Sequence, residues 1–169
     1  ELVTILTGFG CHILCCDPSP TDDVVVMGHQ YVSLEELIKK SDVISLHCPL
    51  NADSQHIIDH AAIQNMKDKV MIINTSRGGL VNTQAIVSGL KSEKIGYLGI
   101  DVYEMESELS NEDLVCETIT NDTYQRLATF PNVLITAHQG FFTSESLQQI
   151  ANTTLKNLQY YFAGKICNE

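Results

Sequence analysis

The sequence has few basic residues, and they do not gather anywhere along the chain. Its 169 residues include 10 Lys and Arg against 21 Asp and Glu, which gives a net charge of −11. Proteins that bind nucleic acids need clusters of basic side chains to contact phosphates, and anionic membranes make the same demand. We therefore expect neither kind of partner.

Long apolar runs and targeting features are also absent. No apolar stretch approaches the roughly 20 residues of a membrane helix. The first residues, ELVTILTGFG, have neither the basic start nor the small-residue cleavage site of a signal peptide. Most of the cysteines fall in or beside predicted buried strands, as free intracellular thiols do. We expect a cytoplasmic protein with reduced thiols and regard a disulfide framework as the weaker alternative.

The glycine-rich fingerprint of dinucleotide-binding proteins is missing as well. That fingerprint, G-x-G-x-x-G, stands after a strand and before a helix. The chain has GFG at 8–10, but CHI follows it in place of a third glycine, and the next predicted element is a strand. We interpret residues 1–10 as the end of a helix and not as a phosphate-binding loop.

What the sequence does contain is an alternation of strands and helices. The capping residues Ser33 (in the capping box Ser33-Leu-Glu-Glu36), Asp59 and Asn82 mark helix starts. Continuous apolar strands alternating with helices predict an α/β fold, a doubly wound parallel sheet covered on both faces. The predicted strands are 11–17, 42–49, 70–75, 95–101 and 132–138, and the predicted helices are 34–41, 60–66, 83–93 and 143–162. The acidic segment 103–131 is predicted to be irregular, with one short helix.

Residues at the ends of the predicted strands, or a few positions after them, lie at the edge of the sheet where ligands bind in such folds. They are Asp17, His47, Cys48, Pro49, Thr75, Ser76, Arg77, Asp101, Glu104, Glu106 and His138. Singly, each has an ordinary structural explanation, such as a loop cap, a surface ion pair or a satisfied histidine. Together, an arginine, a carboxylate and a histidine after three strands of one parallel sheet predict a single site.

A metal site is the weakest interpretation of the sequence. His12, Cys15 and Cys16 are the candidate ligands. Successive residues of a strand point to opposite faces, so Cys15 and Cys16 do not converge easily. We expect no metal.

Four segments resemble the D-2-hydroxyacid dehydrogenase family, and most closely its bacterial fermentative D-lactate dehydrogenases. They are DVISLHCPL, INTSRGGLVN, GYLGIDVYEMESE and PNVLITAHQGFFT, in the family's order. The resemblance implies a Rossmann-like NAD-binding domain at residues 1–142 that is incomplete at its N-terminus, without the Gly-rich loop and the N-terminal substrate domain. It also implies a C-terminal helix at 143–169 that returns to the substrate domain.

The resemblance implies three catalytic residues, Arg77, Glu106 and His138. Arg77 would bind the carboxylate of a 2-oxo acid with its planar fork, with Gly78 and Gly79 giving backbone freedom and clearance. His138 would exchange a proton with the substrate oxygen, and a carboxylate beside it would stabilise the imidazolium. By the spacing of the motif that carboxylate is Glu106, and we rank Glu104 second.

The resemblance also implies NAD as the cofactor. Asp17 would accept hydrogen bonds from the adenosine ribose and would repel the additional phosphate of NADP. Ser54 stands where the family has Asn or Thr. The expected cofactor-binding residues are Asp17, Cys48, Pro49, Ser54, Thr75, Ser76, Arg77 and Asp101.

The predicted activity is hydride transfer between NAD and a 2-hydroxy or 2-oxo acid, with D-lactate and pyruvate as the favoured pair. The alternative is a truncated, non-catalytic homologue kept for binding or regulation, or a relic. Because the phosphate-binding loop is missing from the sequence, we expect this chain alone to be inactive. We expect the full-length form to be a homo-oligomer that binds a small acid.

Overall fold

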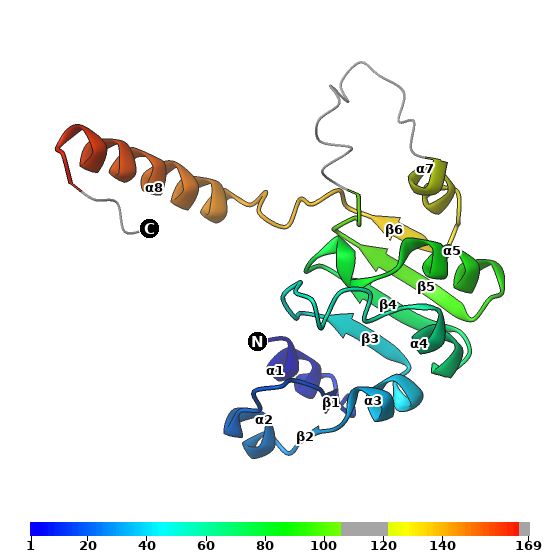
Figure 1. The fold of residues 1–169 in the computed structure, drawn as a ribbon. Helices are drawn as coiled ribbons and strands as arrows, with labels where there is room; N and C mark the ends of the chain where they lie inside the picture. The colour runs from blue at the N-terminus through cyan, green and yellow to red at the C-terminus, as the bar shows by residue number, and fades with distance from the viewer. Residues whose placement is uncertain (106–121, 166–169) are drawn as a thin grey trace. The chain divides into compact units, whose positions relative to one another are not determined.

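The structure is a computed structural model that describes residues 1–105 and 122–165. It divides into two compact units, Glu1–Ala137 and His138–Glu169. The first unit contains all the strands drawn in Figure 1, and the second contains the long helix that ends the described chain.

The first unit is built on parallel strands, as the sequence predicts. Four strands form one sheet in the order β3-β4-β5-β6, and two shorter strands form a second sheet, β1-β2. All of these pairs are parallel. The strands are β1 (Leu14–Cys15), β2 (Gln30–Tyr31), β3 (Val43–Leu46), β4 (Val70–Asn74), β5 (Ile95–Ile100) and β6 (Val133–Ile135). Each predicted strand is present, shortened at its ends.

The helices begin at the residues that the sequence marks as caps. Side-chain oxygens of Ser33, Asp59 and Asn82 accept hydrogen bonds from backbone N–H groups in the first turns of α3, α4 and α5. The predicted capping box is only half formed, because the Glu36 carboxylate accepts from Lys40 Nζ at 2.7 Å. The helices of this unit are α1 (Leu2–Gly8), α2 (Asp22–Val26), α3 (Leu34–Lys40), α4 (His60–Asn65), η1 (Gly78–Leu80), α5 (Thr83–Lys91) and α7 (Asp122–Ala128).

The N-terminal segment confirms our interpretation of the GFG sequence. Residues Leu2–Gly8 form a helix, and β1 follows it. The elements α2, β2 and η1 were not predicted from the sequence. All three are five residues or shorter, which is too short to produce a periodic hydrophobic pattern.

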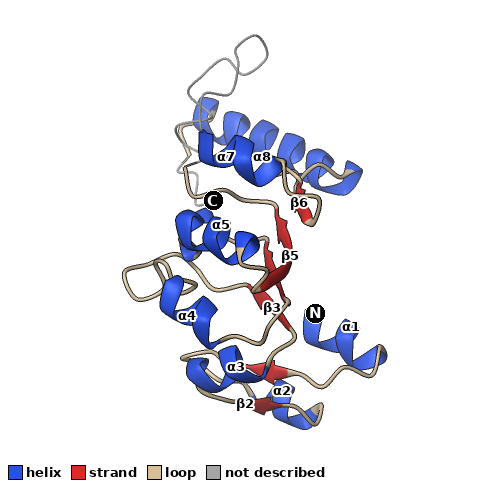
Figure 2. Ribbon diagram, turned by 90° about the vertical axis from the view of Figure 1, so that its right-hand side faces the viewer, coloured by secondary structure: helices blue, strands red, loops and turns tan. Residues whose placement is uncertain are grey.

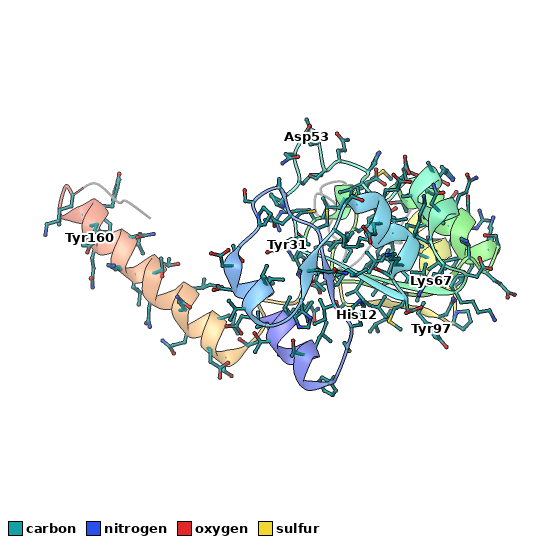
Figure 3. The ribbon with its side chains drawn as sticks, turned by 90° about the horizontal axis from the view of Figure 1, so that it is seen from below. His12, Tyr31, Asp53, Lys67, Tyr97 and Tyr160 are labelled. Carbon is teal, nitrogen blue, oxygen red and sulfur yellow. The ribbon has the colours of Figure 1, made fainter. Side chains whose placement is uncertain are left out.

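The four-stranded sheet is covered on one face by the helices of its own unit. Figure 2 shows α3, α4 and α5 along the same side of the strands. Ile72 and Leu98 point to that side and are at most 3% exposed, whereas Val43 and Tyr97 are 55% and 58% exposed. Tyr97 lies at the surface in Figure 3. Within the first unit, α3, α4 and α5 thus cover one face of the four-stranded sheet, and Val43 and Tyr97 belong to the other face.

The connectivity explains why α3, α4 and α5 lie on the same face of the sheet. Right-handed crossovers place successive helices on the same face when the chain adds strands in one direction. From β3 to β6 each new strand pairs with the strand before it, so the sheet grows in one direction. The helices that follow β3, β4 and β5 therefore gather on one side of the sheet.

The second unit consists mainly of α8 (Ser144–Phe162), close to the predicted helix at 143–162. Thr143 is its N-cap and accepts from Ser146 N at 3.2 Å. None of its residues is buried, and Ile150 and Leu155 are 50% and 59% exposed. None of the helices in the described ranges combines the length and hydropathy that a bilayer span requires.

Close packing between two strand ends gives a testable consequence at Gly78. A Cβ atom built on Gly78 would overlap the backbone of Tyr103 and Glu104. We expect Gly78→Ala to lower the free energy of unfolding by about 1–3 kcal/mol or more, because backbone atoms must move apart. Urea denaturation followed by circular dichroism measures this loss.

Gly79→Ala is the matched control for that substitution. The three atoms nearest to a Cβ on Gly79 all belong to the Leu50 side chain, the closest at 3.0 Å, and Leu50 is 44% exposed and can move. Equal losses of stability in the two variants would contradict the explanation by close backbone packing.

Candidate active site

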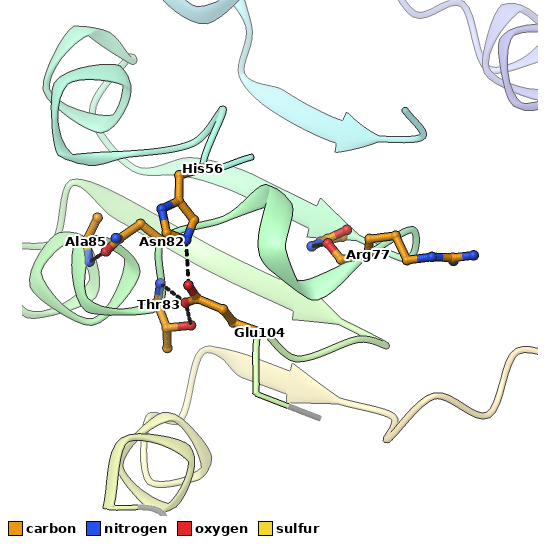
Figure 4. A network of polar contacts seen from close by, with 7 residues as sticks. His56, Arg77, Asn82, Thr83, Ala85 and Glu104 are labelled. Carbon is orange, nitrogen blue, oxygen red and sulfur yellow. Dashed lines mark hydrogen bonds and ion pairs between the residues drawn. The ribbon is translucent and has the colours of Figure 1, made fainter. Parts of the chain in front are cut away.

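Arg77 stands at the carboxyl edge of the sheet, three residues beyond β4. The buried Asn74 shapes the turn that carries it, since Asn74 Nδ2 donates to Arg77 O at 2.9 Å and Asn74 Oδ1 accepts from Ser76 N at 3.2 Å. The guanidinium is exposed and donates to its neighbour Ser76 O at 2.7 Å. Figure 4 shows the side chain extending past the strand ends.

No carboxylate in the described ranges lies within 4.0 Å of the Arg77 guanidinium. The positive charge of Arg77 is therefore exposed to solvent and is not neutralised by an ion pair. A planar fork held in this way is suited to a bidentate contact with a carboxylate ligand.

The ends of β1, β3 and β4 lie close together. Asp17 follows β1, is exposed, and accepts from Ser19 N at 2.7 Å. Burial raises the pKa of the Cys48 thiol, and the nearby charges of Asp17 and Cys16 add to this rise. Ser76 Oγ donates to Cys48 O at 2.8 Å, which joins the ends of β3 and β4. The structure thus brings together several residues that the sequence assigns to cofactor binding.

Other predicted cofactor residues are engaged within the fold. Ser54 is 8% exposed, and its hydroxyl donates to Pro49 O at 2.6 Å and accepts from Asn51 N at 2.9 Å. Asp101 accepts a hydrogen bond from Thr136 Oγ1. Thr75 is exposed at the end of β4. For all of these residues, contact with the cofactor stays a prediction.

Glu104, the second-ranked carboxylate, is committed to a network within the first unit. Its Oε1 accepts from His56 Nε2 at 2.5 Å, and its Oε2 accepts from Thr83 N at 2.9 Å and from Thr83 Oγ1 at 2.6 Å (Figure 4). Burial alone would raise the pKa of Glu104. The hydrogen bonds from Thr83 and His56 outweigh burial and hold that pKa below its ordinary value of 4.5.

His138 begins the second unit with an unusual backbone. Its φ is 56°, and φ of the preceding Ala137 is 52°. Two consecutive non-glycine residues in the left-handed region are uncommon, and such strain is concentrated at functional sites. Glu106 lies outside the described residues. The grouping of Arg77, Glu106 and His138 therefore stays a prediction.

The roles of His56, Thr83 and Asn74 were not predicted from the sequence. Asn74 had a visible signal, since an amide inside an apolar strand must find hydrogen-bond partners when it is buried. His56 had none, because its approach to Glu104 depends on contacts between segments 48 residues apart. In the described part of the chain no three His, Cys, Asp or Glu side chains gather as metal ligands. The described cysteines Cys11, Cys15, Cys16 and Cys48 are free.

The lowered pKa of Glu104 predicts how stability depends on pH. A carboxylate whose pKa is lower in the folded state stabilises the fold above its unfolded pKa, and this contribution is lost as the pH falls through the folded value. We expect Glu104→Gln to cost roughly 1.5–3 kcal/mol at neutral pH, the range for hydrogen bonds to charged groups. Below pH 4.5 the difference from the wild type should shrink.

Denaturant unfolding from neutral to acid pH measures this difference. Glu35→Gln is the control, because it removes a carboxylate from an exposed ion pair of 2.6 Å within α3. A Glu104→Gln curve that stays parallel to the wild type through acid pH would contradict the assignment.

Comparison with known proteins places these features in a family. Residues 1–140 match the sequence profile described as "D-isomer specific 2-hydroxyacid dehydrogenase, NAD binding domain". The chain is 46% identical over 166 residues to D-lactate dehydrogenase of Escherichia coli (strain K12), covering 98% of this chain and 50% of that protein. It is 48% identical over 166 residues, with the same coverage, to a 2-hydroxyacid dehydrogenase homolog of Haemophilus influenzae. The chain thus spans about half the length of the curated relatives it matches.

Solved structures agree with the sequence matches. The pyruvate reductase of Chlamydomonas reinhardtii superposes with a TM-score of 0.90 at 38% identity, covering 99% of this chain and 51% of that one. A D-lactate dehydrogenase from Aquifex aeolicus, complexed with NAD and lactic acid, superposes with a TM-score of 0.86 at 36% identity, covering 96% and 50%. The predicted Rossmann-like fold class is confirmed.

Proposed function

This chain belongs to the D-isomer specific 2-hydroxyacid dehydrogenase family, and we propose that it forms the NAD-binding half of an enzyme that interconverts a 2-oxo acid and a D-2-hydroxy acid. Pyruvate and D-lactate are the proposed pair. The observation that carries the proposal is Arg77, an exposed guanidinium without a carboxylate partner in the described ranges, held by Asn74 at the carboxyl edge of the sheet.

The first unit fits the cofactor at this edge. Asp17 presents an exposed carboxylate beyond β1, of which Oδ1 accepts from Ser19 N. Its other oxygen can accept from a ribose hydroxyl. The end of β1 lies near Cys48, and Ser76 joins the ends of β3 and β4, so the residues proposed to hold NAD share one edge. When bound, NADH supplies the hydride that reduces the substrate carbonyl carbon.

The chain's own residues would bind the substrate and move its proton. Arg77 would hold the carboxylate and polarise the adjacent carbonyl group. His138 would donate a proton to the carbonyl oxygen during reduction and would take it back during oxidation. Glu106 would stabilise the protonated imidazole of His138 and fix its orientation.

The alternative proposal is a non-catalytic homologue that keeps the fold for binding or regulation. A direct test is a chimaera in which this chain replaces the half of the Escherichia coli enzyme that it matches. NADH oxidation with pyruvate is followed by absorbance, and chiral chromatography identifies the lactate. Formation of D-lactate supports the enzyme, and an inactive chimaera supports the alternative.

We further propose that the full-length protein acts in the cytoplasm as a homo-oligomer. The free thiols of Cys11, Cys15, Cys16 and Cys48 support a reducing location. Size-exclusion chromatography with light scattering tests the assembly state.

Loss of Arg77 should remove most of the activity of the chimaera. We expect Arg77→Ala to lower kcat/KM for pyruvate by about 10²–10³-fold, the range found for a single positioned donor. Arg77→Lys should recover part of this, because it keeps the charge and loses the bidentate fork. Arg126→Ala on α7, also exposed, is the control and should have no effect. Similar losses in Arg77→Ala and Arg126→Ala would count against a specific role.

Asp17 should determine the choice between NADH and NADPH. In Asp17→Ala the repulsion of the additional phosphate is removed, so we expect the preference for NADH to fall by about tenfold. Ratios of kcat/KM for the two cofactors measure this change. Asp53→Ala, which removes an exposed loop carboxylate (Figure 3), is the control. An unchanged ratio in Asp17→Ala would refute the assignment.

A further inference from the structure

Glu104 joins three segments that are distant in the sequence. Its two carboxylate oxygens contact His56, in the loop that follows β3, and Thr83, at the start of α5. Glu104 itself lies beyond the end of β5. The side chains of Glu104 and His56 are 24% and 34% exposed, and Thr83 is 7% exposed. The contacts are therefore largely shielded from water.

The position suits a permanently charged carboxylate. Thr83 is the first residue of α5, and a negative charge near a helix N-terminus is favoured by the free N–H groups and the helix dipole. Both oxygens of Glu104 already accept hydrogen bonds. A carboxylate held in this way is poorly placed to exchange protons with a substrate, and well placed to hold backbone segments together.

The segments that contain His56 and Glu104 also contact the turn that carries Arg77. His56 N donates to Gly79 O at 2.8 Å, so one residue binds Glu104 through its side chain and the turn through its backbone. On the other side, the backbone of Tyr103 and Glu104 packs directly against Gly78, where no Cβ fits. Gly78, the residue next to Arg77, is thus enclosed by contacts that form a ring. The ring runs from Gly79 to the backbone and side chain of His56, then to the Glu104 carboxylate, and back through the Glu104 backbone to Gly78.

We propose that Glu104 is a positioning residue that, with His56 and Thr83, holds the turn of residues 77–81 and so sets the place of the Arg77 guanidinium. The proposal rests on the proposed function, in which Arg77 binds the carboxylate of the 2-oxo acid. The ring has no other charged member in the described ranges, since its remaining contacts are made by Thr83, Gly78, Gly79 and the Tyr103 backbone.

Amide hydrogen exchange of this chain tests whether Glu104 holds the turn of residues 77–81. The measurement needs no enzymatic activity. Leu80 N donates to Arg77 O and Val81 N donates to Gly78 O, so amides of the turn report its opening. In Glu104→Ala we expect protection to fall by about tenfold in residues 54–58 and 77–83, and not in α3 or α4. Glu104→Gln should show a smaller fall, because its amide oxygen can still accept from Thr83.

Glu35→Gln is the matched control, since it removes the carboxylate of an exposed ion pair of 2.6 Å. Wild-type protection of the turn in both Glu104 variants would overturn the proposal. If Glu104→Ala unfolds as a whole, Glu104→Gln decides the outcome. A local loss in that variant supports the ring, and a uniform loss or no loss refutes it.

Kinetics of the chimaera test the functional part. Misplacing a substrate-binding group by about 1 Å can cost up to a hundredfold in rate. We therefore expect Glu104→Ala to raise KM for pyruvate by about ten- to a hundredfold, and to raise KM for NADH by less. His56→Gln should retain a lower KM than His56→Ala, because its amide can still donate to Glu104.

The two proposals fail in different ways. An inactive chimaera refutes the proposed function, and exchange in the chain then still decides whether Glu104 holds the turn. An active chimaera in which Glu104→Ala leaves KM for pyruvate unchanged refutes the positioning role alone.

Discussion

The close approach of Gly78 to the backbone of Tyr103 and Glu104 is the constraint on which the rest of this site depends. It brings the chain after β4 against the chain after β5 with no side chain between them. Asn74, almost completely buried, secures the same turn from the strand side through its amide. Because both neighbours are backbone, the position of the turn follows from the pairing of the two strands and not from adaptable side-chain packing.

Glu104 and Arg77 carry opposite charges but do not pair with each other, because the Glu104 carboxylate has other partners. Glu104 accepts from His56, from Thr83 and from the first N–H of α5, and these contacts stabilise its charge. Arg77, one residue from Gly78, has no ion pair in the described ranges and is exposed. The Arg77 guanidinium therefore stays available for an anionic ligand, while the Glu104 carboxylate stabilises the fold.

Local patterns in the sequence are enough to predict most of the elements. Side chains of Ser33, Asp59 and Asn82 cap the helices that they mark, because an N-cap needs only a short polar side chain and its own next turn. Continuous apolar runs predict the parallel strands for the same local reason. Which face each helix covers is not a local property, because it depends on the direction in which strands are added.

The order of strands and helices, the residues at the strand ends and the choice of Arg77 among them could all be predicted from the sequence. These follow from hydrophobic period, capping and the fact that parallel strands end at one edge. The pairing of Glu104 with His56 and Thr83, and the close approach of Gly78 to the Tyr103 backbone, could not be predicted and are seen only in the folded chain. These contacts join residues that are 21 to 48 positions apart. Such pairings arise from the packing of strands and loops in space, which no local pattern records.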